Sequence, residues 1–262
     1  MKNLMYLMIY CAVLLTKVQP AAAYVPSLDF ILTKSTATTG RQIISIDQDV
    51  TFKIGTEEAT IQETWLVEGD KNLKLSAIGK GLFKSNINLH YLYNNKNKTS
   101  VVGKNKFATV LTTDFFEKLF FIRSTESFKA HLKELSITNQ VRLSRADGRV
   151  TFAIGEPSGT KVNPQIWIDQ DEFVIRKIRL PSEVEIDLSN ITSVSTDLMI
   201  AKSQKIQWAG TTVEVKVKNI STKTGATLNQ FYPQNFDQAS EINFTNKTAL
   251  TEAIDQFYKR FR

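Results

Sequence analysis

The sequence predicts a mainly β protein of the α+β class, with about 11 antiparallel strands and a few helices. Apolar and polar side chains alternate with a period of two along residues 42–54, as they do in a strand with one buried face. Turn signals separate such runs, and the dipeptide Asp147-Gly148 is typical of a tight β-hairpin. Residues 248–261 instead repeat their apolar side chains at helical spacing. These three observations favour an antiparallel meander combined with helices.

The same alternation recurs along the chain and defines the other expected strands. The runs are 59–67, 73–77, 87–93, 141–143, 150–154, 166–168, 173–180, 184–188, 206–208 and 213–217. Glu63 is an exception within its run, because its carboxylate falls on the apolar face. A buried carboxylate is costly unless it is paired, so we expect a buried partner for Glu63.

Helices are expected at both ends of the exported chain. A short helix follows Pro26 and ends by Gly40. The last helix covers Thr248–Phe261 and has one apolar stripe, made of Ala249, Leu250, Ala253, Ile254, Phe257, Tyr258 and Phe261. This stripe packs against the sheet or, in the alternative interpretation, lies on a membrane surface.

A helical insertion at about 113–136 interrupts the strands. Asp114 is the expected N-cap of a helix over Phe115–Ile122, and Ser124 or Thr125 is the expected N-cap of a second helix. Six of the eight residues in 115–122 are apolar, which is too many for an exposed helix. This segment is therefore either a core helix or a lid over an apolar cavity.

The first 23 residues have the order of a signal peptide. Lys2 supplies a positive charge, Leu4–Leu15 is an apolar run of 12 residues, and Ala21–Ala23 is a small-residue cleavage site. The run is shorter than the roughly 18 residues that span a bilayer. We expect export, cleavage after Ala23, and a single domain over 24–262. The alternatives are an uncleaved membrane anchor and lipidation at Cys11, which lies inside the apolar run.

Charge and composition disfavour several function classes. Loss of Lys2 and Lys17 with the signal peptide lowers the formal net charge from +7 to +5, and no basic block with interleaved aromatics predicts nucleic-acid binding. Cys11 is the only cysteine, so the mature chain can form no disulfide. The only histidines, His90 and His131, belong to no recognised catalytic or metal-binding motif. We expect a monomer that is not an enzyme and has no cofactor or metal.

Two stretches of the sequence carry a family resemblance. Residues Val141–Gly155 read VRLSRADGRVTFAIG, and Pro164–Asp169 read PQIWID. With the aromatic-proline segment Phe231–Pro233, they resemble the LolA/LolB/RseB group of periplasmic lipoprotein-handling domains, especially its divergent outer membrane lipoprotein-sorting relatives. The resemblance covers most of the mature chain.

The resemblance implies an incomplete antiparallel β-barrel whose concave face holds acyl chains or a lipoprotein, with helices closing that face. It implies no catalysis and no cofactor. The expected residues of the apolar cavity are Trp65, Leu73, Leu75, Leu89, Tyr91 and Trp167. The expected lid residues are Phe115, Phe116, Leu119 and Phe120.

The resemblance implies a periplasmic binding protein for lipid acyl chains or lipoproteins, acting in outer-membrane lipoprotein sorting with a membrane-associated donor or acceptor protein. The alternative is a periplasmic sensor module that recognises lipoproteins and contacts a signalling partner. Carriers of this group have an Arg-Pro-Asn run after the second meander strand, where the arginine helps hold the closed state. The nearest match here, Lys71–Leu73, lacks both the arginine and the proline.

Overall fold

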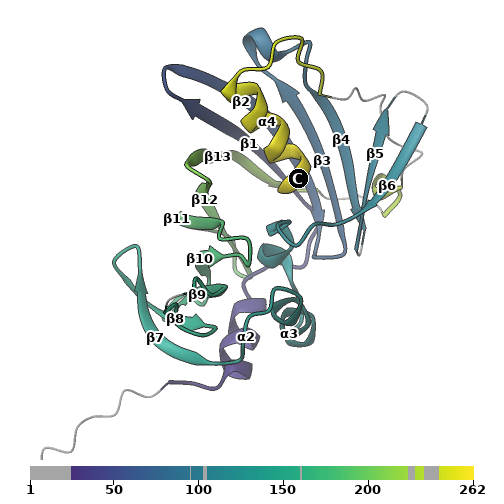
Figure 1. The fold of residues 1–262 in the computed structure, drawn as a ribbon. Helices are drawn as coiled ribbons and strands as arrows, with labels where there is room; N and C mark the ends of the chain where they lie inside the picture. The colour runs from purple at the N-terminus through teal and green to yellow at the C-terminus, as the bar shows by residue number, and fades with distance from the viewer. Residues whose placement is uncertain (1–24, 95, 103–104, 160, 224–227, 233–241) are drawn as a thin grey trace, which may run out of the picture.

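The computed structural model describes residues 25–94, 96–102, 105–159, 161–223, 228–232 and 242–262 (Figure 1). The signal peptide, 1–23, lies outside the described residues, so export and cleavage stay predictions. Pro233, the last residue of the aromatic-proline segment, also lies outside them.

One antiparallel sheet of 13 strands organises the described chain, in the order β6-β5-β4-β3-β2-β1-β13-β12-β11-β10-β9-β8-β7. The strands are β1 (Ile44–Ile54), β2 (Glu57–Glu68), β3 (Asn72–Gly79), β4 (Asn88–Asn94), β5 (Asn97–Val102), β6 (Asn105–Val110), β7 (Val141–Ala146), β8 (Arg149–Ile154), β9 (Gln165–Asp169), β10 (Ile175–Arg179), β11 (Glu185–Ser195), β12 (Leu198–Trp208) and β13 (Thr211–Thr222). The chain runs outward from β1 to the edge strand β6. It then crosses to the other edge, β7, and returns to pair β13 with β1. Because the two edge strands do not pair, the sheet is an incomplete barrel, as expected.

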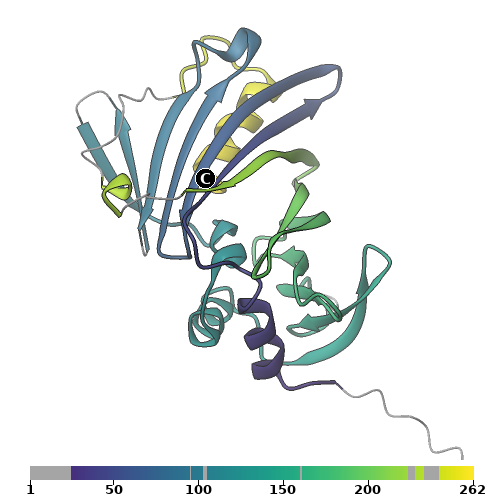
Figure 2. The same ribbon diagram turned by 180° about the vertical axis from the view of Figure 1, so that it is seen from behind.

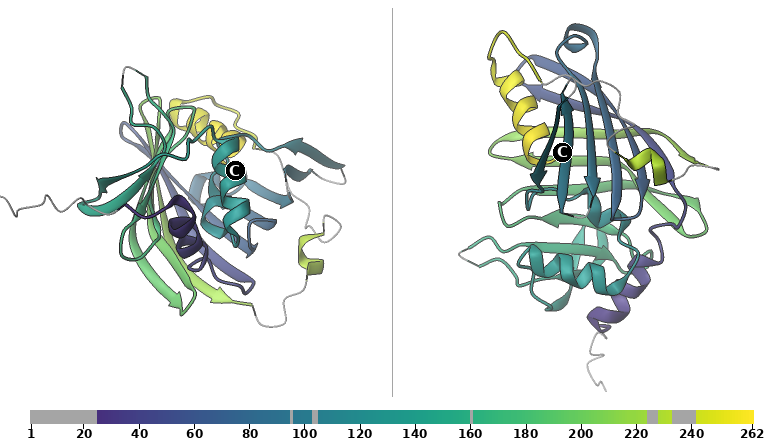
Figure 3. Two further views of the ribbon diagram at one scale, coloured as in Figure 1. Left: turned by 90° about the horizontal axis from the view of Figure 1, so that it is seen from below. Right: turned by 90° about the vertical axis from the view of Figure 1, so that its right-hand side faces the viewer.

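The helical elements take different positions: segments 28–36, 117–121, 125–134 and 249–260 pack against the main apolar cluster of this curved sheet, whereas 228–231 lies on the opposite side of the sheet from 249–260 (Figures 2 and 3). They are α2 (Leu28–Thr36), η1 (Gly81–Phe83), η2 (Glu117–Phe121), α3 (Thr125–Glu134), η3 (Leu228–Phe231) and α4 (Ala249–Arg260), where η denotes a 3₁₀ turn. Within the described residues, every helix is too short or too polar to cross a membrane.

Capping and turn residues behave largely as the sequence predicts. The Ser27 and Ser124 side chains accept hydrogen bonds from the first turns of α2 and α3, so both helices begin at predicted positions. Asp147 and Gly148 have φ angles of 50° and 72°, the left-handed backbone that a tight β7–β8 hairpin requires.

The structure has two strands more than the sequence predicted. β5 and β6 form a hairpin in the polar stretch 97–110, where apolar and polar residues do not alternate cleanly. Every position of β6 is exposed, so backbone pairing with β5, and not burial of one face, defines this strand. β11 and β12 are also longer than predicted and continue to the turn between Ser195 and Leu198.

Candidate functional site

The inner face of β2, β3 and β4 forms an apolar wall. Trp65, Leu73, Leu75 and Leu89 are buried in one large apolar cluster, and Tyr91 is half-buried against the same cluster. The structure therefore brings together five of the six residues that we predicted to line a cavity. Their role in holding a ligand stays a prediction.

Trp167, the sixth predicted cavity residue, lies on the opposite face of the sheet. Its neighbours in β9, Ile166 and Ile168, belong to the main cluster, whereas Trp167 packs with Ala146 and Ala153. Successive side chains of a strand point to opposite faces, so Trp167 cannot share a face with both isoleucines. Because every residue of β9 is buried, its sequence alone does not reveal which side is concave.

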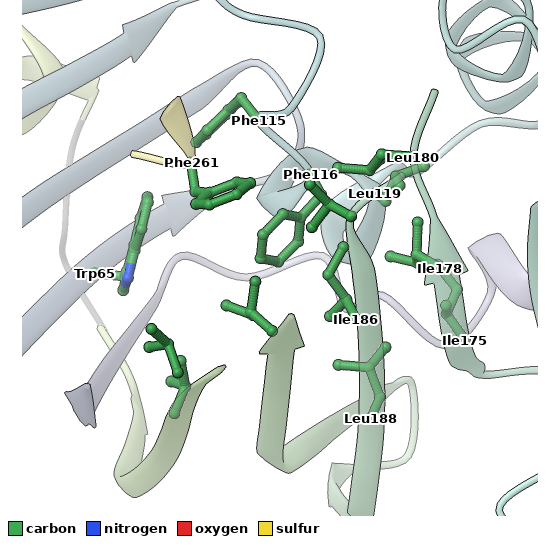
Figure 4. Packing of buried hydrophobic residues seen from close by; sticks show 14 of the residues in the cluster. Trp65, Phe115, Phe116, Leu119, Ile175, Ile178, Leu180, Ile186, Leu188 and Phe261 are labelled. Atoms are coloured by element: carbon green, nitrogen blue, oxygen red, sulfur yellow. The ribbon is translucent and has the colours of Figure 1, made fainter. Parts of the chain in front are cut away.

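Residues 115–122, here called the lid segment, pack on the concave side of the sheet (Figure 4). Phe115, Phe116 and Leu119 are buried, and Phe120 is partly buried against the same cluster. The prediction of a helix over Phe115–Ile122 is wrong, because the segment forms only the single 3₁₀ turn η2. A turn of this kind has few backbone hydrogen bonds of its own, so side-chain packing holds the lid segment in place.

Asp114 does not cap this turn, contrary to the prediction. The N-cap position of η2 is Phe116, which makes no side-chain capping bond. The Asp114 carboxylate instead accepts hydrogen bonds from Ser182, between β10 and β11, and from Arg260 in α4. The start of the lid segment is thereby attached to both the sheet and α4.

Aromatic rings connect the lid segment to the wall. The Phe115 ring stacks on Tyr93 with a centroid distance of 4.4 Å and an interplanar angle of 10°. The Tyr93 ring in turn lies 5.6 Å from Trp65. Phe116 points toward α4, where its ring lies 6.4 Å from Phe261 (Figure 4). Such ring pairs stabilise packing beyond the area that they bury.

Helix α4 is the second cover of the concave face. Its first turn is closed by reciprocal hydrogen bonds between Thr248 and Thr251. The Phe257 ring meets Phe52 of β1 edge to face, with the centroids 5.2 Å apart. The expected docking of this helix on the sheet is confirmed, and the apolar stripe is buried except for Ala249.

A buried ion cluster lies where the two covers meet. The Arg262 guanidinium is 3.1 Å from the Glu63 carboxylate and 2.9 Å from the Glu117 carboxylate, measured between nearest N and O atoms. Glu63 also accepts hydrogen bonds from Gln48, at 2.7 Å, and from the Trp65 ring nitrogen, at 3.1 Å. The expectation that Glu63 has a buried partner is confirmed. The cluster joins β1 and β2 to the lid segment and to the end of α4.

Burial perturbs the charges of this cluster. Loss of solvent raises the pKa of Glu117 to about 7, even though Arg262 opposes that shift. Burial also works to lower the pKa of Arg262, but the Glu63 and Glu117 carboxylates outweigh it and the pKa is raised. Lys98, whose Nζ donates to the Tyr258 carbonyl at 3.0 Å, has its pKa lowered to about 7, mainly by burial. Burial thus moves the pKa of the Glu117 carboxylate toward neutral pH.

A mostly apolar pocket lies beside the ion cluster, between the lid segment, α2, β1 and β10–β13. Of the predicted site residues, Trp65, Leu119 and Phe120 line it. Its volume is about 60 Å³, whereas pockets for small-molecule ligands usually have roughly 300–1,000 Å³. The pocket is therefore too small to hold a long acyl chain as it stands.

The described residues offer no other recognisable chemical centre. No three His, Cys, Asp or Glu side chains within them are grouped to hold a metal ion. His90 lies on β4 within 2.9 Å of the Ser76 hydroxyl, and His131 lies on α3 beside Glu134. The arrangement on the concave face is suited to binding by apolar contact.

Comparisons with known proteins identify the fold. No protein-family model matches the sequence, and a search of curated proteins finds no match. A LolA superfamily protein from Nitrosomonas europaea matches with a TM-score of 0.57 and 10% identity, over 81% of this chain and all of that one. A domain from Vibrio parahaemolyticus named for outer membrane lipoprotein sorting has a TM-score of 0.56 at 12% identity, over 79% and 97%.

A DUF1329 family protein from Desulfovibrio piger is similar to the same extent, with a TM-score of 0.54 and 9% identity over 79% of this chain and 96% of that one. The chain thus has a LolA-like fold, and the predicted fold class is confirmed. At these identities the likeness carries the fold alone, because one fold can host many functions.

The sequence did not predict two residues of this site, Arg262 and Gln204. Arg262 looked like an ordinary basic residue after a helix, yet it is buried in the ion cluster. The unpaired Glu63 was the one signal that such a cation was needed. Gln204, in β12, lines the pocket and is only 8% exposed. No pattern in the sequence distinguishes it from the exposed polar residues nearby.

Proposed function

We propose that the protein binds lipid acyl chains or the acylated ends of lipoproteins in the periplasm, in outer-membrane lipoprotein sorting. The single observation that carries the proposal is the lid segment, an apolar stretch with one helical turn that is buried between an apolar wall and α4. The name of the Vibrio parahaemolyticus domain supports the sorting role by analogy. The predicted signal peptide supports the location.

Binding by this route exchanges one set of apolar contacts for another. A ligand that enters must displace Phe116 and Leu119 from the face that they cover. Each acyl methylene that takes their place contributes about 0.8 kcal/mol. Opening the lid segment also separates Glu117 from Arg262, which are 2.9 Å apart in the closed state. Opening then has to cost no more than a few kcal/mol for binding to be favourable.

Native mass spectrometry of the protein exported by its own host tests the proposal. We expect an added mass that corresponds to a retained lipid, and saturable binding of a fluorescent fatty acid after delipidation. Phe120→Asp should weaken that binding about tenfold or more, because it places a charge in the apolar pocket. Leu82→Asp is the matched control, since Leu82 is exposed and outside the pocket. Absence of saturable binding to any acyl probe would contradict the proposal.

A carrier and a sensor differ in what their partner does. The proposed carrier needs a membrane-associated donor or acceptor protein that exchanges the lipid with it. Capturing partners from a membrane extract with the lipid-loaded protein separates these roles. We expect the captured partner to remove the bound lipid. A partner that binds the loaded protein and leaves the lipid in place would favour the sensor.

A further inference from the structure

One buried hydrogen-bond acceptor in the pocket has no partner. Gln204 is 8% exposed and lines the pocket, and its Oε1 accepts no hydrogen bond from any residue that the structure describes. Burying an amide oxygen without a donor is unfavourable, so such groups usually find one. The pocket wall thus carries an unused acceptor beside apolar side chains, including Leu188 and Val217.

Three other polar side chains of the pocket are engaged with neighbouring groups of the protein. The Gln48 amide donates to Glu63. The Thr38 hydroxyl donates to the Ser35 carbonyl, and the Thr39 hydroxyl has carbonyl acceptors in Thr36 and Ile122. These three donors are therefore used, and the buried Gln204 atom that has no partner is the acceptor Oε1.

The charge of the pocket wall disfavours an anionic ligand. Glu117 is the one ionisable side chain among the residues that line it, and none of these residues is a lysine or an arginine. Arg262 pairs with both Glu117 and Glu63 and is not among the residues that line the pocket. A carboxylate or phosphate group in the pocket would meet no cation on the wall and, having no donor when ionised, would leave the Gln204 Oε1 unpaired.

We infer that this pocket is a headgroup subsite for a neutral lipid that donates a hydrogen bond, such as an amide or a hydroxyl next to an acyl chain. Gln204 accepts the N–H or O–H of the head, and the chain follows the apolar wall beneath the lid segment. The inference rests on the proposed function and adds the chemical class of the ligand to it.

Three ligands with the same 12-carbon acyl chain test the inference by calorimetric titration at pH 8. N-lauroylethanolamine donates hydrogen bonds, methyl laurate has no donor, and laurate is an anion. We expect N-lauroylethanolamine to bind about tenfold more tightly than methyl laurate, the usual value of one hydrogen bond. Laurate should bind most weakly. Equal binding of the first two, or tightest binding of laurate, would overturn the headgroup subsite and leave the proposed function standing.

Gln204→Met links the preference to this residue, because methionine keeps the chain length and removes the acceptor. We expect the variant to lose the tenfold preference for N-lauroylethanolamine and to bind methyl laurate at least as well as the parent. Gln207→Met, at a half-buried position of the same strand outside the pocket, is the control and should keep the preference. A Gln204→Met protein that keeps the preference contradicts the inference, and failure of all three ligands to bind the parent protein contradicts the proposed function as well.

Discussion

Helix α4 and the lid segment cover the same concave face in different ways. α4 has 12 residues, a capping box at its start and an apolar stripe packed on β1 and β2. The lid segment has one 3₁₀ turn of five residues and no side-chain cap. A regular helix keeps its backbone hydrogen bonds by itself, whereas a single turn depends on its side-chain contacts. We therefore expect α4 to be a fixed part of the core and the lid segment to be the cover that opens.

Three contacts join these unequal covers. Arg262, just after α4, pairs with Glu117, and the ring of Phe261 lies 6.4 Å from that of Phe116. Arg260 of α4 bonds to Asp114, which directly precedes the lid segment. Opening the lid segment thus breaks contacts with α4 while α4 itself can stay in place. Substitutions in α4, in the ion cluster and in the lid segment test whether the two covers differ in this way.

The largest effect is expected for Phe257→Asp in α4. The side chain is fully buried, so the change removes a core ring and buries a charge. We expect the free energy of unfolding, measured in urea, to fall by more than about 5 kcal/mol. Gln256→Asp, at an exposed position of the same helix, should change it by only about 0.5 kcal/mol. If the Phe257→Asp protein is as stable as the parent, α4 is not a fixed cover.

Next in size is Arg262→Met, which removes the cation of the ion cluster. Glu63 would then be left buried without its ionic partner, and we expect a loss of about 3–5 kcal/mol at pH 8. Adding Glu63→Gln should recover part of that loss, because the second change removes the unpaired charge. Losses that simply add in the double variant would show that the two residues are not coupled.

The pH dependence of stability is a smaller effect and reports on the lid segment. Glu117 has a folded-state pKa of about 7 against an ordinary value of 4.5, so the folded protein holds a proton that the unfolded chain releases in this window. The contribution to the free energy of unfolding is therefore largest below pH 4.5 and is lost as the pH rises toward 7. We expect it to be about 1–3 kcal/mol.

Comparison with Glu117→Gln isolates this contribution between pH 5 and 7.5. The lowered pKa of His131, caused mainly by burial, acts in the opposite direction and is present in both proteins. The lowered pKa of Lys98 affects stability above pH 7. An unchanged pH profile in the variant would mean that Glu117 does not titrate in this window.

The sequence predicts the parts of this molecule in which one face is buried and the other is wet. The strand along 42–54 and the α4 stripe follow directly from such periodicity. The β5–β6 hairpin does not, because only backbone pairing holds it in the sheet. Trp167 could not be assigned to a face, since its strand is buried on both sides.

Only the apolar part of the site, the wall and the lid segment, could be predicted from the sequence. Alternation places Leu73 and Leu75 on the wall, and composition marks the lid segment as buried. The contact between Glu63 and Arg262 joins residues 199 positions apart, and nothing local encodes it. The segment's single turn also depends on the space between sheet and α4, which tertiary packing defines.

Phe116→Ala is expected to have the smallest effect and separates a lid from a plug. If the lid segment can open, Phe116→Ala destabilises only the closed state, because the open state lacks the Phe116 contacts in the parent and in the variant alike. The cost of opening then sets an upper limit on the loss of stability. We expect the free energy of unfolding to fall by only about 1–2 kcal/mol, and the affinity for a fluorescent fatty acid to rise about 5- to 30-fold. Phe52→Ala, a fully buried phenylalanine of β1, is the matched control and should cost about 3–5 kcal/mol. A Phe116→Ala protein that loses as much as this control and binds no lipid would identify the lid segment as a permanent part of the core.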